Sequence, residues 1–266
     1  MLKDNEDKWT EYGKEIKSMF QKHSQSLFSS ELTNSICFQT SHRFPPIDSS
    51  VTRQLDKELQ DSEIKQALFG MEAWKSLGPD GFLAGFYQNT WHITRENVYN
   101  FIQQLWHKDV PLEDINSADI CLIPKVERPK AVTQFQPIAL CNMIYTMFSK
   151  EILQCMHKTK RKVCSFAMKL DLSKAYDNIN WNFVSDVLSE VGILDKLKDL
   201  IMIAVTSVKM RVLWNGAKGE FFEAKKGLRQ GDSLSPYLLI LCMEKLSHLI
   251  QDDVEDNMWN YVKIAK

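Results

Sequence analysis

Apolar residues recur at intervals of three and four along much of the chain, which is the spacing of an amphipathic helix with one buried face. The pattern predicts helices that begin near residues 61, 94, 142, 180, 195 and 235, and a further helix within residues 1–60. Asn180, Asp195 and Ser235 stand where helix caps belong, and Gly192 and the turn at residues 78–81 mark helix ends. The last helix is expected to run to about residue 250. The predicted apolar stripes are Trp9, Ile16, Met19 and Phe20; Ile64, Ala67, Leu68 and Met71; Val98, Phe101, Ile102 and Leu105; Ile144, Phe148, Ile152 and Cys155; Trp181, Val184, Leu188 and Val191; and Leu197, Leu200, Ile201, Ala204 and Val205.

Other stretches carry the signals of β-strands. A short strand is expected at residues 119–124. It should end there, because Pro124 cannot donate a hydrogen bond to a central ladder. Residues 166–172 place their apolar side chains on one face and Asp171 on the opposite face. Residues 208–214 alternate, and Asn215-Gly216 predicts a hairpin with a return strand at 221–225. The order of the elements predicts an α+β fold, with helices packed on one face of a mixed or antiparallel sheet.

Composition and charge limit what the chain can do. With 266 residues and 44% hydrophobic residues, the chain can bury an ordinary globular core. Its formal net charge of −1 means that any binding of nucleic acid must depend on local basic patches. The six cysteines form no C-x-x-C pair, so neither a zinc site nor a disulfide framework is predicted. The charged N-terminus and the lack of a long apolar run predict an intracellular protein of the nucleus or cytoplasm, neither secreted nor membrane-anchored.

Two segments carry residues suited to chemistry: Phe166-Ala-Met-Lys-Leu-Asp171-Leu-Ser-Lys-Ala-Tyr176-Asp177 and Gly227-Leu-Arg229-Gln230-Gly231-Asp-Ser-Leu-Ser-Pro236. A lone Asp at a strand end is usually a turn former or cap, and a lone Tyr is usually part of the core. In the second segment the glycines permit close approach of a ligand, and the helix that follows offers unpaired N–H groups. A loop that merely caps a helix would explain Ser235-Pro236 but not residues 229–232.

A basic cluster precedes the first of these segments. It contains Lys158, Lys160, Arg161 and Lys162, and Lys225, Lys226 and Arg229 lie in or beside the second segment. These cations are candidates for binding nucleic acid.

The two segments resemble motifs A and B of the palm of reverse transcriptases, most closely those of plant non-LTR (LINE-type) retrotransposons. Residues 75–81, 122–125 and 135–142 resemble the fingers motifs of that family, and the resemblance covers roughly residues 60–255. It implies a partial right-hand polymerase. Residues 1–60 would be a variable helical lead-in, 61–157 the fingers-like part, and 158–266 a partial palm.

The resemblance also implies roles for individual residues. Asp171 would be the catalytic carboxylate and a ligand of Mg²⁺, and Tyr176 would exclude a nucleotide that carries a 2′-hydroxyl. Gln230 and Gly231 would support the template base and the incoming nucleotide, which Lys125 would also contact. The implied partners are an RNA template, a DNA primer and a dNTP.

The chain departs from the family pattern in several places. Leu77 stands where the family has Pro, and Gln136 stands where it has an Arg that would neutralise triphosphate oxygens. The junction between Ile152 and the basic cluster is several dozen residues shorter than in the family. No aromatic-Ala-Asp-Asp segment, the family's motif C, occurs among the 266 residues, and Asp252-Asp253 is expected to be a solvated acidic run after the last helix. With this hairpin and the thumb missing, the chain is predicted to be an inactive polymerase fragment. A non-catalytic nucleic-acid-binding module and a polymerase completed by another chain are the alternatives.

Overall fold

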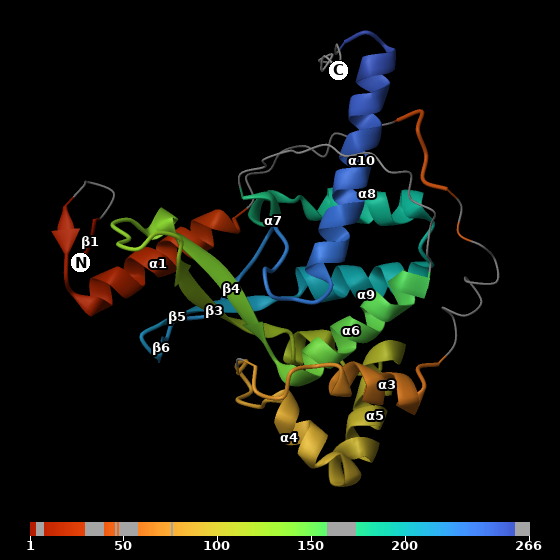
Figure 1. Ribbon diagram of the computed structural model, residues 1–266, viewed down its shortest axis with the longest axis horizontal. Helices are drawn as coiled ribbons and strands as arrows, with labels where there is room; N and C mark the ends of the chain where they lie inside the picture. The colour runs from red at the N-terminus through yellow and green to blue at the C-terminus, as the bar shows by residue number, and fades with distance from the viewer. Residues whose placement is uncertain are drawn as a thin grey trace, which may run out of the picture.

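The computed structural model describes residues 1–3, 8–29, 40–45, 47, 58–75, 77–158 and 174–258 (Figure 1). The helices are α1 Gly13–Leu27, α3 Asp61–Phe69, α4 Ala84–Asn89, α5 Trp91–His107, α6 Met143–Lys158, α7 Ala175–Asn178, α8 Trp181–Val191, α9 Asp195–Thr206 and α10 Ser235–Glu255, with 3-10 turns η1 Leu112–Asp114 and η2 Val132–Gln134. The strands are β1 Leu2–Lys3, β2 Trp9–Thr10, β3 Ser117–Pro124, β4 Phe135–Cys141, β5 Lys209–Trp214, β6 Ala217–Lys218 and β7 Phe222–Glu223.

The main sheet is mixed, as the sequence predicts. Its described strands run in the order β4-β3-β5-β6, and β7 pairs with β5. Strand β3 is antiparallel to β4 and parallel to β5, so that Ile120 lies opposite Ala139 on one side and Val212 on the other. Helix α1 covers the apolar face of this sheet, where Ile16 and Phe20 are buried in the same cluster as Ile120 and Val212. The α1 helix lies beside the sheet in Figure 1.

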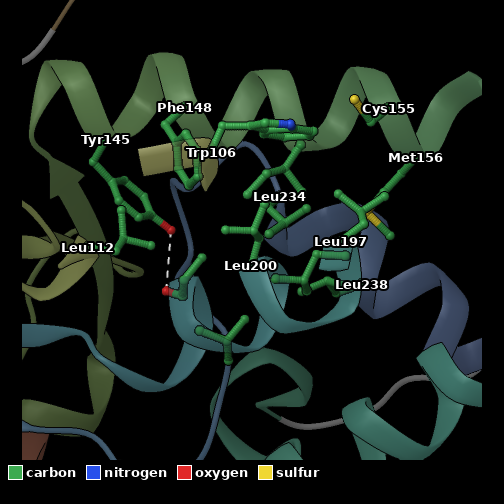
Figure 2. Packing of buried hydrophobic residues seen from close by; sticks show 14 of the residues in the cluster. Trp106, Leu112, Tyr145, Phe148, Cys155, Met156, Leu197, Leu200, Leu234 and Leu238 are labelled. Atoms are coloured by element: carbon green, nitrogen blue, oxygen red, sulfur yellow. Dashed lines mark hydrogen bonds between the residues drawn. The ribbon is translucent and has the colours of Figure 1, made fainter. Parts of the chain in front are cut away.

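A second core lies among the helices and holds the larger apolar cluster. Figure 2 shows side chains from α5, α6, α9 and the start of α10 converging there. Trp106, Tyr145 and Phe148 are among the largest fully buried side chains of the described residues. Burial of a side chain such as that of Phe148 stabilises the fold by about 1.5–3 kcal/mol. The helices therefore form a body of their own and do not all cover the sheet.

Local signals place some helix ends correctly. The side chain of Asn180 accepts a hydrogen bond from the N–H of Asn182 at 2.8 Å, and Gly192 ends α8 with φ of +77°. Both features agree with the prediction, because Asn is a favoured N-cap and Gly readily adopts the left-handed conformation. The hairpin predicted at Asn215-Gly216 is also present, and both residues have positive φ.

Other ends differ from the sequence prediction. The α5 helix begins at Trp91 after Thr90, so the expected cap Thr94 lies inside the helix. Trp9 pairs in a short β-ribbon and does not belong to α1. Asp195 and Ser235 are the first residues of α9 and α10, not their caps.

The last helix is longer than predicted. It continues to Glu255, so Asp252 and Asp253 lie within the helix and do not follow it. The segment at residues 40–45 contacts this end of α10, with the N–H of Ser41 donating to Asp252 at 2.9 Å. A tertiary contact of this kind extends a helix beyond the point where its apolar stripe ends.

The turn at residues 78–81 joins the first helices to the sheet. Asp80 accepts a hydrogen bond from the N–H of Met143 at 2.7 Å, and its own N–H donates to the side chain of Asn142 at 2.9 Å. A Cβ on Gly78 would lie 2.2 Å from the carbonyl oxygen of Cys141. The turn is thus held against the junction of β4 and α6, and a side chain at position 78 would push it away.

The described part of the chain contains four cysteines, Cys121, Cys141, Cys155 and Cys242, and all are free thiols. Burial raises the pKa of the Cys242 thiol to about 12. None of the described helices is both long and apolar enough to cross a lipid bilayer.

Candidate functional site

The described end of the first segment, residues 174–177, lies beside the second segment. The N–H of Gly227 donates to the carbonyl of Ile179 at 2.7 Å, and the N–H of Leu228 donates to that of Tyr176 at 2.7 Å. Gly227 has φ of +87°, and a Cβ there would approach the carbonyl oxygen of Asp177 to 2.9 Å. Glycine is the residue that permits this close pairing. The position of Tyr176 is therefore set by backbone hydrogen bonds to the second segment.

Residues 230 and 231 of the second segment are docked on strand β4. The carbonyl of Gln230 accepts the N–H of Ala139 at 2.7 Å, and its side-chain oxygen accepts the amide of Gln136 at 2.5 Å. Gly231 has φ of +113°, and a Cβ on it would lie 2.4 Å from the carbonyl oxygen of Ala139. These contacts satisfy part of the exposed edge of β4 and fix the loop on it. They also show that Gln136, where the resemblance led us to expect Arg, is tied to Gln230.

Arg229 and Asp232 form a buried ion pair beneath this loop. The guanidinium donates to Asp232 at 2.9 Å, to the side chain of Asn116 at 2.6 Å and to the carbonyl of Ala204 at 3.0 Å. It also contacts the hydroxyl of Tyr145, which donates to Asp232 at 2.8 Å. Burial raises the pKa of this hydroxyl well above its ordinary value, so Tyr145 is neutral at physiological pH.

This burial corrects one expectation from the sequence. Arg229 was a candidate for contacting nucleic acid, but its side chain is only 5% exposed and its donors are directed at protein acceptors. A buried guanidinium with these partners stabilises the loop and does not reach a phosphate at the surface. Asp232, which carries the opposite charge, belongs to the run at residues 229–232, but the sequence assigns it no role.

A group of cations surrounds the buried carboxyl group of Asp177, next to Tyr176. Burial raises the pKa of Asp177, while Lys174, Lys125 and Lys226 oppose this shift. Lys174 and Lys125 also act on His23, whose pKa is lowered by burial and by these two charges. Lys125 and Lys174 are exposed, Lys125 in the hairpin between β3 and β4. The structure therefore gathers positive charge beside Tyr176 in a chain whose net charge is −1.

Tyr176 itself is half-buried, and it packs against the helical core. Gln230 is likewise half-buried, whereas Gly231 is exposed. Tyr176 is joined to the second segment by the N–H of Leu228, two residues before Gln230. Sequence reasoning named Lys226 as a candidate cation but missed Lys174, although Lys174 lies within the first of the two conspicuous segments.

Burial of the carboxyl group of Asp177 costs free energy in the folded state. Its Oδ1 atom is buried without a hydrogen-bond partner among the described residues, and the side chain as a whole is 4% exposed. An unsatisfied buried acceptor costs about 1–3 kcal/mol. The raised pKa of Asp177 also indicates a cost, because burial disfavours the ionised form of the carboxyl group.

Because burial disfavours the ionised carboxyl group, we expect the Asp177→Asn variant to be more stable than the natural chain at pH 7. A carboxyl group whose pKa is raised in the folded state contributes stability below its unfolded pKa, and that contribution is lost as the pH rises through the folded pKa. The advantage of the variant should therefore disappear toward pH 3. Urea unfolding at several pH values measures it, with the exposed Asp109→Asn as control. A variant less stable than the natural chain at pH 7 would contradict the prediction.

Two carboxylates near this surface are engaged in ion pairs, Asp119 with Arg211 at 2.6 Å and Lys218 at 3.6 Å, and Asp232 with Arg229. The carboxyl group of Asp177 is buried. The described residues therefore do not by themselves fit a centre for two divalent cations, which needs open carboxylate ligands. Asp171 lies outside the described residues, as do Lys160, Arg161, Lys162 and the side chain of Lys158.

Comparisons with known proteins agree with the position of these segments. A family model described as reverse transcriptase (RNA-dependent DNA polymerase) matches residues 122–262, more than half of the chain. The chain is 22% identical to the Pol polyprotein from type-2 retrotransposable element R2DM of Drosophila melanogaster, over 85% of this chain and 23% of that protein. It is 23% identical to the Pol polyprotein from type-1 retrotransposable element R2 of Nasonia vitripennis, over 72% of this chain and 21% of that protein. An uncharacterized mitochondrial protein of Arabidopsis thaliana is 60% identical over 51 residues, 19% of this chain and 42% of that protein.

Proposed function

The chain belongs to the reverse transcriptase (RNA-dependent DNA polymerase) family, and we propose that it supplies the template-facing and nucleotide-facing surface of a non-LTR retrotransposon polymerase. The reaction is nucleotidyl transfer. The 3′-oxygen of the primer forms a bond to the α-phosphorus of a dNTP, the bond to pyrophosphate breaks, and the hydroxyl proton leaves to a base or solvent. The chain spans less than a quarter of the two Pol polyproteins, so the activity of a whole polyprotein is a proposal for this chain.

The observation that carries the proposal is the hydrogen bonding of the Tyr176 segment to the segment that contains Gln230 and Gly231, with three lysines acting on the neighbouring Asp177. Lysine ammonium groups attract phosphate oxygens as point charges. A rigidly placed aromatic ring beside the sugar site would exclude a 2′-hydroxyl, and the docked loop at residues 230–231 would support the template base. In this proposal residues 61–157 act as fingers and residues 158–266 as part of the palm.

Metal chemistry requires residues beyond those described. When bound, divalent cations of the Mg²⁺ type would activate the primer hydroxyl and neutralise the triphosphate. The family pattern makes Asp171 one ligand, and the remaining carboxylates are not among the described residues near Tyr176. We therefore expect a polypeptide of these 266 residues to bind template without extending a primer on its own. The pairing of the neutral Gln136 with Gln230 supports this expectation.

Removing the lysine group should weaken binding of single-stranded RNA. We expect the triple variant Lys125→Ala, Lys174→Ala, Lys226→Ala to reduce the slope of log affinity against log salt by about 2, since each phosphate contact on a single strand contributes about 0.7. Fluorescence anisotropy of a labelled RNA across salt concentrations measures the slope. The control is a triple variant of equal charge, Lys14→Ala, Lys65→Ala, Lys209→Ala, whose residues are exposed elsewhere. Equal slopes for the two triple variants would remove the proposed surface.

The same lysine group favours a second candidate, a non-catalytic nucleic-acid-binding module. Primer extension distinguishes the two functions. The natural chain receives an oligo(dT)-primed RNA, dNTPs and Mg²⁺ or Mn²⁺, and is compared with Asp171→Asn. Extension that depends on Asp171 would establish the polymerase and contradict the expected inactivity of the isolated polypeptide.

A further inference from the structure

Three potential metal ligands from distant parts of the chain meet at the C-terminal end of α10. His42 lies in the segment at residues 40–45, and Asp252 and Glu255 are one turn apart on the helix. Figure 1 shows this segment, in orange, beside the far end of α10. The Nδ1 atom of His42 is 2.6 Å from Oδ1 of Asp252, and its Nε2 atom is 3.4 Å from Oε1 of Glu255. One ligand atom from each residue lies within 4.8 Å of the others.

Asp252 holds the imidazole in a defined orientation. Its carboxylate accepts the N–H of Ser41 at 2.9 Å and also the hydroxyl of Ser41. With Nδ1 of His42 donating to the same carboxylate, the hydrogen-bond network assigns the lone pair of the neutral imidazole to Nε2. The ring of His248 stacks on that of His42 with centroids 6.3 Å apart, which limits its rotation. A carboxylate that fixes a histidine in this way is the usual support of a metal-bound imidazole.

The Nε2 atom of His42 and the Oε1 atom of Glu255 are spaced like two ligands of one metal ion. Two ligands that each lie about 2.1 Å from a tetrahedral cation are about 3.4 Å from each other. This is the separation between Nε2 of His42 and Oε1 of Glu255. Asp253 and Asp256 line an open hollow together with Asp252 and Glu255, so further oxygen ligands lie close by.

The charge around this end of the helix favours a cation. The last turn of α10 contains no basic residue, while Asp252, Asp253 and Glu255 lie in or next to it. Carboxylates at a helix C-terminus interact unfavourably with the negative end of the helix dipole. A bound divalent cation would offset that repulsion and join residues 40–45 to α10.

We propose that this end of α10 is a divalent-cation site of the Zn²⁺ class, with His42 Nε2 and the Glu255 carboxylate as ligands and Asp252 as the positioning residue. Asp253 or Asp256 and water complete the coordination. An imidazole nitrogen selects Zn²⁺ or Co²⁺ over Mg²⁺. The site lies about 30 Å along α10 from the loop at residues 230–231, given a rise of about 1.5 Å per residue. It is therefore separate from the proposed nucleotide surface and does not depend on polymerase function.

Calorimetric titration of the full chain with Zn²⁺, in a large excess of Mg²⁺, tests the proposal. We expect one site whose affinity falls at least tenfold in Glu255→Gln and in His42→Ala, and about 10–100-fold in Asp252→Asn. Glu255 is exposed, so its replacement leaves the fold intact. The controls His107→Ala and Glu113→Gln remove an exposed imidazole and an exposed carboxylate elsewhere, and should retain the natural affinity.

A Co²⁺ titration separates this site from binding by cysteine. The proposed ligands are nitrogen and oxygen, so the absorption spectrum should lack a thiolate charge-transfer band. Zn²⁺ binding that is equally strong in His42→Ala and His107→Ala, a thiolate band, or no binding to the natural chain would each overturn the proposal.

Discussion

Replacing Arg229 with alanine is expected to lower the free energy of unfolding by about 3–5 kcal/mol, because the carboxylate of Asp232 would remain buried without its counter-ion. Asp232 is 4% exposed, and Arg229 is its ion-pair partner at 2.9 Å. The hydroxyl of Tyr145 would remain as a hydrogen-bond donor to Asp232, but it carries no charge. Asn116 and the carbonyl of Ala204 would each lose a donor at the same time.

Urea unfolding of Arg229→Ala measures this loss, and Lys225→Ala is the matched control. Lys225 is a cation four residues away whose side chain is exposed, so its replacement should change the stability by less than about 0.5 kcal/mol. The double variant Arg229→Ala, Asp232→Ala should lose less stability than the sum of the single variants, because it leaves no unpaired charge. Equal, small losses for Arg229→Ala and Lys225→Ala would contradict the buried pair.

The contrast between Arg229 and Lys225 shows where sequence reasoning reaches its limit. Arg229 lies in the second segment and Lys225 lies just before it, and the local pattern gives no reason to bury one and expose the other. The difference arises from Tyr145, Asn116 and Ala204, which lie 84, 113 and 25 residues away along the chain. Such partners come together only in the fold.

Helix ends follow the same rule. Asn180 and Gly192 act through their own backbone neighbours, so the sequence alone predicts them correctly. The end of α10 depends on Ser41 and His42, about two hundred residues away, and the prediction stopped too early. The spacing of apolar residues places Trp9 in a helix, but Trp9 pairs with Lys3 in a short antiparallel β-ribbon. Helix ends that depend on neighbouring residues can therefore be predicted from sequence, whereas contacts between distant residues cannot.

In the candidate site too, the motif residues could be predicted from sequence, whereas the contacts between distant residues could not. The sequence motifs indicate Tyr176, Gln230, Gly231 and Lys125. The structure joins the segments of Tyr176 and Gln230 by backbone hydrogen bonds, and the charge of Lys125 acts on Asp177. Their proposed roles remain predictions. The side-chain hydrogen bond from Gln136 to Gln230 joins residues that are 94 positions apart, and no local sequence pattern predicts it.

Replacing Gly231 with alanine should detach the loop from strand β4. Gly231 has φ of +113°, and an added Cβ would lie 2.4 Å from the carbonyl oxygen of Ala139, a distance that requires the backbone to move. Strain and overpacking together should lower the free energy of unfolding by about 2–4 kcal/mol. The shift would also strain the hydrogen bonds of Gln230 to Ala139 and Gln136, so the surface beside Tyr176 should lose affinity for RNA as well as stability.

The control for this change is Gly216→Ala. Gly216 also has a positive φ, +78°, but a Cβ there meets nothing within 4 Å. Its replacement should therefore cost only the conformational penalty, about 1 kcal/mol. The difference between the two variants in urea unfolding isolates the contact with Ala139, and anisotropy titrations of RNA on the folded variants isolate its effect on the proposed site. If Gly231→Ala lost no more stability and no more RNA affinity than Gly216→Ala, the loop would not be held on β4 by this contact.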